Sequence, residues 1–410
     1  MTFAPVRIAH LADIHIGMEN YGRLNPETGL NQRLHDFLRS LDQAIDGAIA
    51  AGVHLVVIAG DIYKTRDPSA THQREFARRI RRLVDAGVPV FIAAGNHDLP
   101  LAPGRATSVD IFRALDVPQV TIARTVSPQT VATRVGPVQV LAFPWTLRSM
   151  ALAQAEFKNR TILELNQAMI DLNRAKLLAD AQGLDPSLPT IVVGHAHMLG
   201  GRIGAERLLT MGNDPMYDLG LFDLPGVDYV ALGHLHQHQA MSYQRPGIVY
   251  AGSIDRVDFG EEGEDKGWVQ VELVAKGQAE WQFHRVQSRT FLTVDARVEG
   301  DNATDEVIRA IARHGDTVRE AIVRLRVEIP AERVGELHDE AIRAQLKTAY
   351  HLTPIELRVR QRARDRWGAD AATIQRAAPL VALAYYLEHQ GVEAARRELL
   401  LGYAGELMGA

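Results

Sequence analysis

Five short apolar runs in this chain are each followed directly by side chains that bind metal ions. In order, the motifs are Asp13-Ile14-His15, Gly60-Asp61, Gly95-Asn96-His97-Asp98, Gly194-His195 and Gly233-His234-Leu235-His236. Short apolar runs bounded by turn signals are typical of strands buried on both faces of a sheet. In open α/β sheets, ligand sites gather where strands give way to loops. The sequence therefore predicts an α/β fold with a functional site at these strand ends.

The residue types in the motifs favour a transition-metal centre. Carboxylate and amide oxygens mixed with imidazole nitrogens suit manganese, iron or zinc. Two such ions about 3.5–4 Å apart can clamp a phosphate and supply a hydroxide that attacks it. One motif alone is weak, because an Asp-x-His pair is common by chance and a single histidine is more often structural. Five motifs in this order predict a two-metal phosphoesterase centre.

Spacing indicates how the side chains are arranged. Asp13 and His15 are two residues apart, so both point to one side of an extended strand end, and His234 and His236 repeat that spacing. Asp61 is the natural bridging carboxylate, because one oxygen-rich side chain can serve both ions. The glycines that precede ligands let the backbone turn sharply and approach the ions closely.

His97 differs from the neighbouring motif residues. Because it follows Asn96, it can reach the scissile phosphate instead of an ion and donate a proton to the leaving oxygen. Asp98 either orients His97 or only forms the turn. The Gly-His pattern favours His195 as the ligand, and His197 stays an alternative.

Bulk properties narrow the class of protein. A chain of 410 residues is too long for a single core and predicts two or three domains. Its net charge of -5 offers nucleic acid no overall positive field, so attraction to DNA would need local patches, metal ions or a partner. The absence of cysteine excludes disulfides and thiolate metal sites and fits a reducing cytosol. With no signal-peptide pattern and no apolar run near the roughly 18 residues of a membrane span, we expect a cytoplasmic protein.

The first two-thirds of the chain alternate strands with helices. Strands are predicted at Val6–Ala12, Leu55–Ala59, Val88–Ala94, Val138–Phe143, Thr190–Val193, Val227–Leu232, Gly247–Ala251 and Trp268–Leu273. Helices are predicted over residues 34–49, after the cap Ser69, and over Ala155–Gln182.

After about Arg285 the pattern changes to a βαβαβ run without metal motifs, which predicts a small separate domain. Its predicted strands are Phe291–Val298, Ala321–Ile329 and Ile355–Val359, and its predicted helices are Thr304–Arg313 and Glu332–Ala349. The segment Arg358–Arg366 then carries five alternating arginines, which either track a phosphate backbone or form a solvated linker. Two amphipathic helices, Ala372–His389 and Val392–Leu407, either pack on the small domain or present a surface to a partner helix.

On these motifs the chain resembles the calcineurin-like metallophosphoesterase superfamily, whose fold is two mixed β-sheets flanked by helices. Within it, the chain more closely resembles the SbcD nuclease subunits of bacterial SbcC–SbcD DNA-repair complexes, and the resemblance covers nearly the whole chain. Its most specific piece outside the metal motifs is Gly252–Glu262 with Lys266, for which residue types give no chemical role. Lys64 departs from relatives that often carry an acidic residue or histidine there. It either contacts a DNA phosphate or is a solvated loop lysine.

The resemblance implies a ligand set for two manganese ions. One ion would be held by Asp13, His15 and His236, and the other by Asn96, His195 and His234. Asp61 would bridge them, and His97 would act in catalysis without being a ligand.

The resemblance also implies a function: a manganese-dependent DNA nuclease with single-strand endonuclease activity and, with a partner, double-strand exonuclease activity. The partner would be SbcC, an ABC-type ATPase docked on the C-terminal helices, and a homodimer is expected. The implied domains are a nuclease domain (1–285), a DNA-capping domain (286–366) and docking helices (367–410). One alternative is a phosphodiesterase or phosphatase acting on nucleotides, lipids or phosphoproteins, and another is a scaffold that lost its metals. The capping domain and docking helices weigh against the first, and the complete ligand set weighs against the second.

Overall fold

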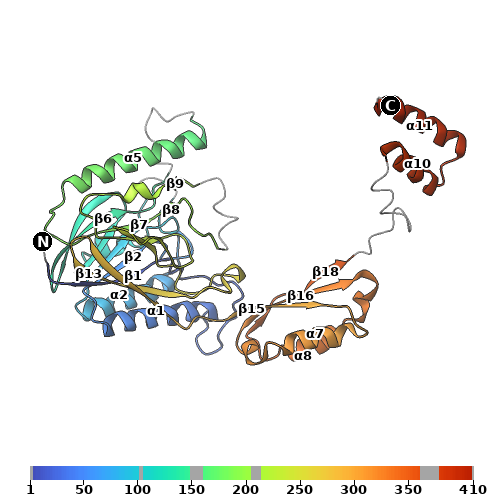
Figure 1. The fold of residues 1–410 in the computed structure, drawn as a ribbon. Helices are drawn as coiled ribbons and strands as arrows, with labels where there is room; N and C mark the ends of the chain where they lie inside the picture. The colour runs from blue at the N-terminus through green and yellow to red at the C-terminus, as the bar shows by residue number, and fades with distance from the viewer. Residues whose placement is uncertain (1–2, 101–104, 148–159, 205–213, 361–377, 409–410) are drawn as a thin grey trace. The chain divides into compact units, whose positions relative to one another are not determined.

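The computed structural model describes residues 3–100, 105–147, 160–204, 214–360 and 378–408 (Figure 1). The chain divides into two units. The first comprises Met1–Thr293, Asp316–Val323 and Thr348–Thr353, and the second comprises Val294–Gly315, Arg324–Lys347 and Pro354–Ala410. None of the helices in the described ranges is both long and apolar enough to cross a lipid bilayer.

Two six-stranded mixed sheets form the centre of the first unit, as predicted. One has the order β14-β13-β1-β2-β3-β4, with β1 (Val6–Leu11), β2 (Leu55–Ala59), β3 (Val90–Ala93), β4 (Val120–Ala123), β13 (Gly267–Ala275) and β14 (Gln278–Arg285). The other has the order β11-β12-β10-β7-β6-β5, with β5 (Ser127–Thr133), β6 (Gly136–Phe143), β7 (Thr190–His195), β10 (Tyr229–Gly233), β11 (Gln239–Ser242) and β12 (Gly247–Tyr250). The strands β1 to β4 pair in parallel, whereas β13 pairs with β1 antiparallel.

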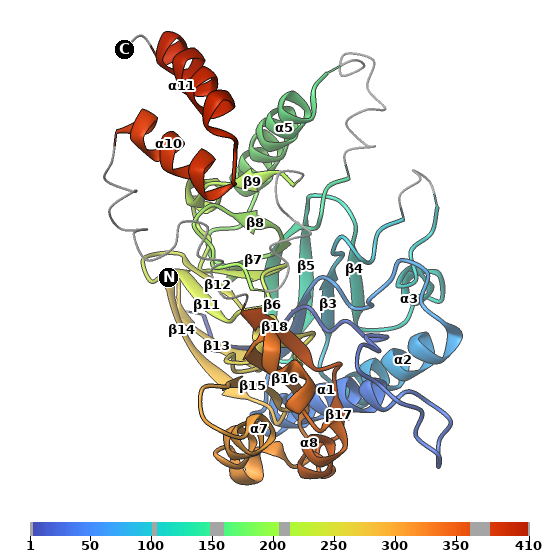
Figure 2. The same ribbon diagram turned by 90° about the vertical axis from the view of Figure 1, so that its right-hand side faces the viewer.

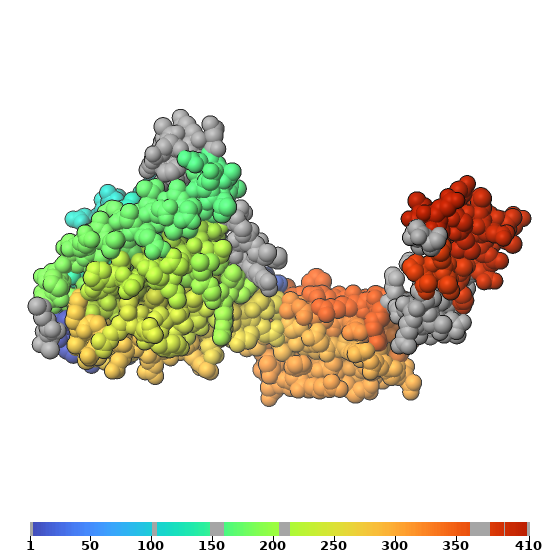
Figure 3. All heavy atoms as spheres, turned by 45° about the horizontal axis from the view of Figure 1, so that its top comes forward, coloured from blue at the N-terminus to red at the C-terminus, as the bar shows by residue number. Residues whose placement is uncertain are grey.

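Helices cover the outer faces of this sandwich. On one side lie α1 (Gln32–Ala50) and α2 (Ala70–Asp85), and on the other lies α5 (Ile162–Gln182) (Figures 1 and 2). In the space-filling view, α5 forms a continuous green band over its face (Figure 3). The strand β2 is apolar throughout because both of its faces are buried: Val57 packs between the sheets, whereas Ile58 packs in the cluster that contains residues of α1 and α2.

Helix boundaries follow the predicted signals. The Ser69 hydroxyl accepts a hydrogen bond from the His72 amide at the start of α2, and Gly87, with φ +71°, follows its end. The strands β4, β5, β11 and β14 were not predicted, and they are the four edge strands of the two sheets, where polar and partly exposed residues are tolerated. Short elements complete the unit: α3 (Asp110–Ala114), β8 (His197–Met198), β9 (Met216–Tyr217), β17 (His351–Leu352) and 3₁₀ turns at Leu219–Phe222, Phe259–Glu261 and Gly315–Val318.

The βαβαβ pattern appears as a four-stranded sheet with two helices. Its elements are β15 (Phe291–Arg297), α7 (Ala303–Ala312), β16 (Ile322–Pro330), α8 (Asp339–Gln345), β17 and β18 (Glu356–Arg360). The single helix predicted over Glu332–Ala349 is wrong: a 3₁₀ turn (Ala331–Glu336) precedes a short α8. The break has a tertiary cause, because the Thr304 hydroxyl donates to the Glu336 carbonyl (2.8 Å) and accepts from the His338 amide (3.0 Å).

The arginine-rich segment and the terminal helices are described in part. Arg358 and Arg360 belong to β18, and Arg360 donates to the Val298 carbonyl (2.6 Å). The remainder of that segment, and residues 372–377 of the first predicted terminal helix, lie outside the described residues. The helices α10 (Pro379–His389) and α11 (Ala394–Met408) are separated at Gly391, with φ +69°.

A buried ionic cluster secures α1. Asp36 is fully buried and its carboxylate accepts from Arg33 (3.1 Å) and Arg289 (2.8 Å). Burial opposes its charge, but the two arginines lower the pKa of Asp36 below its ordinary value.

We predict that Asp36→Asn lowers the free energy of unfolding by about 3–5 kcal/mol, because it removes the carboxylate charge that the buried guanidinium groups of Arg33 and Arg289 contact most closely. The Asp36 carboxylate makes this contribution to the free energy of unfolding at neutral pH. The contribution is lost as the pH falls through the lowered pKa of Asp36 in the folded protein. Urea unfolding of the metal-free protein measures it, with the exposed Asp46→Asn as the matched control. Equal destabilisation by the two variants would contradict the prediction.

Candidate metal centre

The strand ends of both sheets bring the predicted ligands together. β1, β2 and β3 of one sheet lead to Asp13, Asp61 and Asn96, and β7 and β10 of the other lead to His195 and His234. Asp13, His15, Asp61, His195, His234 and His236 are all buried. A site made from two sheets is therefore assembled by loops that are far apart in sequence.

One donor group contains Asp13, His15 and His236, whose ligand atoms all lie within 4.8 Å of one another. The two Nε2 atoms of His15 and His236 are 2.9 Å apart. These three residues are the set predicted for one ion.

A second donor group contains Asp13, Asp61 and His195, also within 4.8 Å. His195 Nε2 lies 3.0 Å from Asn96 Oδ1 and 3.4 Å from Asp61 Oδ2. Asp13 belongs to both groups, and Asp61 Oδ2 of the second group is 3.8 Å from His15 Nε2 of the first, so this carboxylate faces both groups. That is the position expected of a bridging ligand.

The hydrogen bonds around the two imidazoles show that the donor set fits a cation. His195 Nδ1 lies 2.8 Å from the Ala59 carbonyl and must donate to it, because a carbonyl only accepts. In the neutral ring, Nε2 then presents a lone pair towards two oxygens that also carry lone pairs. His236 Nδ1 similarly donates to a Glu261 carboxylate oxygen (2.7 Å), which leaves its Nε2 lone pair facing His15. At His195 the converging lone pairs need a proton or a metal ion between them, and at His236 the Nε2 lone pair accepts either a metal ion or the hydrogen of a neutral His15 Nε2–H.

Burial and charge decide which imidazoles are neutral. Desolvation lowers the pKa of His15 and of His234 well below the ordinary value, so both rings keep lone pairs for a metal. Burial also opposes a charge on His195, but the neighbouring Asp61 and Asp13 raise its pKa to about 9. In the metal-free protein, a proton on His195 thus supplies the positive charge that the oxygens need.

Backbone strain is concentrated at this site. Asp13, His15, Asp61 and His234 have φ of 48°, 49°, 54° and 102°, and they are four of the eight non-glycine residues with positive φ in the described part of the chain. Such conformations cost of order 1–3 kcal/mol each and persist where surrounding contacts over-determine them. The His234 amide, for example, donates to both oxygens of Asp13 (3.1 and 3.0 Å). The fold thus holds these residues in place before any ligand arrives.

His97 lies at the accessible side of the cluster. Its side chain is 29% exposed, whereas that of Asp61 is 4% exposed. His97 Nδ1 donates to the Lys64 carbonyl (2.8 Å), so Nε2 faces the site, 4.0 Å from Asp61 Oδ2. The backbone of Lys64, not its ammonium group, is therefore what orients this ring.

Asp98 bonds to backbone amides and not to His97, the partner that the sequence suggested. Its carboxylate accepts from the amides of Ile62 (3.0 Å) and Gly95 (2.9 Å), and these contacts join the loop after β2 to the loop after β3. Of the two roles left open for Asp98, the geometry fits the loop-forming one, since the Lys64 carbonyl already occupies His97 Nδ1.

The alternative ligand His197 lies beside His234, with ring centroids 5.6 Å apart. His195, by contrast, contacts both Asn96 and Asp61 directly. Trp145, which sequence reasoning missed, packs against His234 at 5.0 Å between centroids. An indole wall of this kind shields the ring from water, and nothing in the local sequence around Trp145 indicates it.

Sequence reasoning also missed Glu261 and Lys266 as parts of the site. Both are buried, and Lys266 Nζ lies 2.9 Å from a Glu261 oxygen. Burial opposes ionisation of Glu261, but His236 and Lys266 lower its pKa. The segment Gly252–Glu262, for which residue types gave no chemical role, thus reaches a predicted ligand through its last turn.

The motif glycines serve close packing of the backbone more than turning. Of the glycines that precede predicted ligands, Gly60 has a positive φ (+85°). At two others a side chain would clash: a Cβ on Gly95 would lie 2.2 Å from Asp61 Oδ1, and a Cβ on Gly233 would lie 2.0 Å from the Ala59 carbonyl oxygen. Strands of the two sheets meet too closely here for side chains.

We predict that Gly95→Ala weakens divalent-metal binding at least tenfold, because the new methyl group must displace the Asp61 carboxylate. Gly263→Ala is the matched control, since a Cβ there meets nothing within 4 Å. Isothermal titration with Mn²⁺ measures both variants. Wild-type affinity in Gly95→Ala would show that the loop adjusts without moving Asp61.

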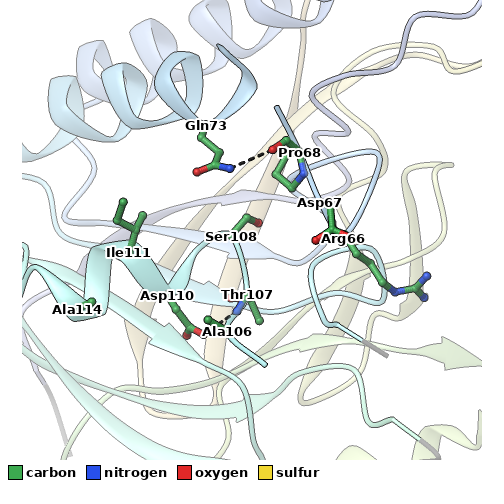
Figure 4. Close-up of a pocket in the computed structure, with 10 residues that line it drawn as sticks. All are labelled: Arg66, Asp67, Pro68, Gln73, Ala106, Thr107, Ser108, Asp110, Ile111 and Ala114. Carbon is green, nitrogen blue, oxygen red and sulfur yellow. Dashed lines mark hydrogen bonds between the residues drawn. The ribbon is translucent and has the colours of Figure 1, made fainter. Parts of the chain in front are cut away.

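A pocket of about 470 Å³ opens between the loop after β2 and the start of α3 (Figure 4). Its walls are Arg66, Asp67, Pro68, Gln73, Ala106, Thr107, Ser108, Asp110, Ile111 and Ala114. The Gln73 amide points to the Pro68 carbonyl across it. None of the predicted site residues lines this pocket, so it is distinct from the metal centre.

Comparison with known proteins shows which family this chain belongs to. Residues 6–238, more than half of the 410, match the family described as calcineurin-like phosphoesterase. The chain is 28% identical over 270 residues to the SbcD component of the nuclease SbcCD from Staphylococcus epidermidis (65% of this chain, 66% of the relative). It is 25% identical over 279 residues to the uncharacterized metallophosphoesterase YhaO of Bacillus subtilis (67% and 59%), and 24% identical over 257 residues to the DNA double-strand break repair protein Mre11 of Archaeoglobus fulgidus (62% and 52%).

These matches span less than two thirds of each relative's length. The family match confirms the predicted superfamily, and with it a phosphoester hydrolase that binds divalent metals. The chain belongs to the calcineurin-like phosphoesterase family.

Proposed function

We propose that this protein is a manganese-dependent DNA nuclease of the SbcD type. The observation that carries the proposal is the buried pair of donor groups that share Asp13, with Asp61 facing both groups and the accessible His97 beside them. Two of the relatives above are a nuclease component and a DNA double-strand break repair protein, and this supports DNA over other phosphoesters. A third relative is uncharacterized and favours no substrate class. The substrate comparison described below tests for DNA.

In this proposal each site residue has one task. Asp13, His15 and His236 hold one Mn²⁺, Asn96, His195 and His234 hold the other, and Asp61 bridges them. When bound, such a pair of ions neutralises phosphodiester charge and makes water a better nucleophile. The Lys64 carbonyl holds His97 with Nε2 towards the substrate, so the protonated ring donates its hydrogen to the leaving 3′ oxygen. Asp98 fixes the loops that carry Asp61 and His97.

We further propose three functional parts: a nuclease domain (1–285), a DNA-capping domain (286–366) and helices that dock on an SbcC-type ABC ATPase (367–410). The helices α10 and α11 support the last part, because they expose large apolar residues. These are Val381, Tyr386, Leu399, Leu400, Tyr403 and Leu407. An exposed apolar helix surface is typical of a partner-binding site. We also propose that the protein is a homodimer and that it acts in the cytoplasm.

The alternative is a metallophosphoesterase that acts on a non-DNA phosphoester, and the donor groups fit it equally well. Three substrates with added Mn²⁺ separate the two functions: a single-stranded DNA circle, bis-p-nitrophenyl phosphate and p-nitrophenyl phosphate. We expect nicking of the circle and hydrolysis of the diester. Hydrolysis of the monoester with an intact circle would favour the alternative. Hydrolysis of the diester alone would leave a phosphodiesterase whose action on DNA then has to be tested with the ATPase added.

A further inference from the structure

Glu261 and Lys266 form a buried ion pair directly behind the predicted ligand His236. Glu261 is 0% and Lys266 1% exposed, and Lys266 Nζ lies 2.9 Å from Glu261 Oε2. The other Glu261 oxygen lies 2.7 Å from His236 Nδ1. Two opposite charges without access to water are costly to bury, so this pair calls for an explanation beyond routine packing.

The pair holds His236 at both its ring and its backbone. Glu261 accepts from the ring, whereas Lys266 Nζ donates to the His236 carbonyl (3.0 Å). The Ser253 amide donates to the same carbonyl (2.9 Å). The ring nitrogen and the carbonyl of His236 are therefore both bonded to one short segment, residues 252–266.

That segment is itself anchored. The Arg256 guanidinium donates to the Glu261 carbonyl (3.2 Å), the Glu264 carbonyl (2.7 Å) and the Ser288 hydroxyl (2.7 Å). The Val257 amide donates to Glu261 Oε2 (2.9 Å). Glu261 is thus placed by several bonds and does not depend on His236 for its position.

The acceptor of the His236 ring differs in charge from those of the other oriented rings. His195 donates to the Ala59 carbonyl and His97 donates to the Lys64 carbonyl, both neutral groups. His236 donates to a carboxylate. A carboxylate that accepts from one imidazole nitrogen increases electron density on the other, which strengthens its bond to a metal ion.

We infer that Glu261 is a positioning residue that strengthens divalent-metal binding by His236, and that Lys266 keeps Glu261 charged and correctly placed. The inference rests on the proposed metal centre but not on the substrate being DNA. The centre would then be asymmetric, because the ion held by His236 has a carboxylate behind its ligand.

Titration of the metal-free full-length protein with Mn²⁺ by isothermal calorimetry tests the inference. Wild type is expected to take up two ions. In Glu261→Gln, which keeps the shape but not the charge, one of the two sites is expected to weaken about 10–100-fold while the other keeps its affinity. Glu262→Gln is the matched control, because that neighbouring carboxylate accepts from Thr293 instead (2.6 Å) and should leave both sites unchanged.

A double variant separates metal binding from folding. Glu261→Gln leaves Lys266 with Glu264 as its carboxylate partner (2.8 Å) and so can lower the unfolding temperature. Glu261→Gln combined with Lys266→Met removes both charges. It should recover the unfolding temperature of the metal-free protein while Mn²⁺ binding at the one site stays weak.

The outcomes are distinguishable. Two wild-type-like sites in Glu261→Gln, or recovery of Mn²⁺ affinity in the double variant, would overturn the inference and leave the metal centre intact. A wild-type protein that does not take up two ions would overturn the proposed centre itself.

Discussion

An Asp61→Asn variant is expected to lose metal binding and phosphodiesterase activity together, each by more than about 100-fold. Asp61 is 3% exposed, and its Oδ2 lies 3.4 Å from His195 Nε2 and 3.8 Å from His15 Nε2, one residue in each donor group. The change is isosteric but removes a carboxylate charge that faces both groups. Outer-shell partners of metal ligands already contribute about 10–100-fold, and a ligand between two ions should contribute more.

Mn²⁺ titration and hydrolysis of bis-p-nitrophenyl phosphate measure the two losses on the same samples. Asp67→Asn is the matched control, because Asp67 is an exposed aspartate in the same loop. Retention of two tightly bound ions in Asp61→Asn would rule out a bridging role for this carboxylate.

A His97→Ala variant is expected to lose activity by about 10²–10⁴-fold with unchanged Mn²⁺ binding, the range typical of a general acid. The physical reason is the position of the ring. Its Nδ1 is occupied by the Lys64 carbonyl, and its Nε2 lies on the accessible side of the centre. The ring can therefore reach a substrate, whereas the more deeply buried imidazoles cannot.

Nicking of a single-stranded DNA circle and hydrolysis of the small diester should fall together in this variant. His338→Ala, at an exposed histidine, serves as the control and should behave as wild type. If metal content falls as steeply as activity, His97 is a ligand and the proposed division of roles is wrong.

Much of the fold was predictable because its central strands obey a simple pattern. A strand such as β2, with residues of one parity facing the second sheet and the others facing α1 and α2, must be apolar throughout. The edge strand β14 alternates exposed and partly buried residues and carries polar groups, so its sequence is compatible with a loop. The break before α8 depends on Thr304, some thirty residues away, and no local rule contains it.

By itself, the sequence determined the chemistry of the centre: which oxygen and nitrogen donors are present, and that they follow buried strands. The tertiary structure decided how those donors are used. It placed the Ala59 carbonyl, the Lys64 carbonyl and the Glu261 carboxylate where they accept from His195, His97 and His236, which fixes the ring nitrogen that carries the hydrogen. It also placed the Asp98 carboxylate on loop amides instead of on His97. The physical reason is that a motif specifies side chains locally, whereas a hydrogen-bond partner is any group that folding brings within about 3 Å. The Ala59 carbonyl that accepts from His195, for example, lies 136 residues away along the chain.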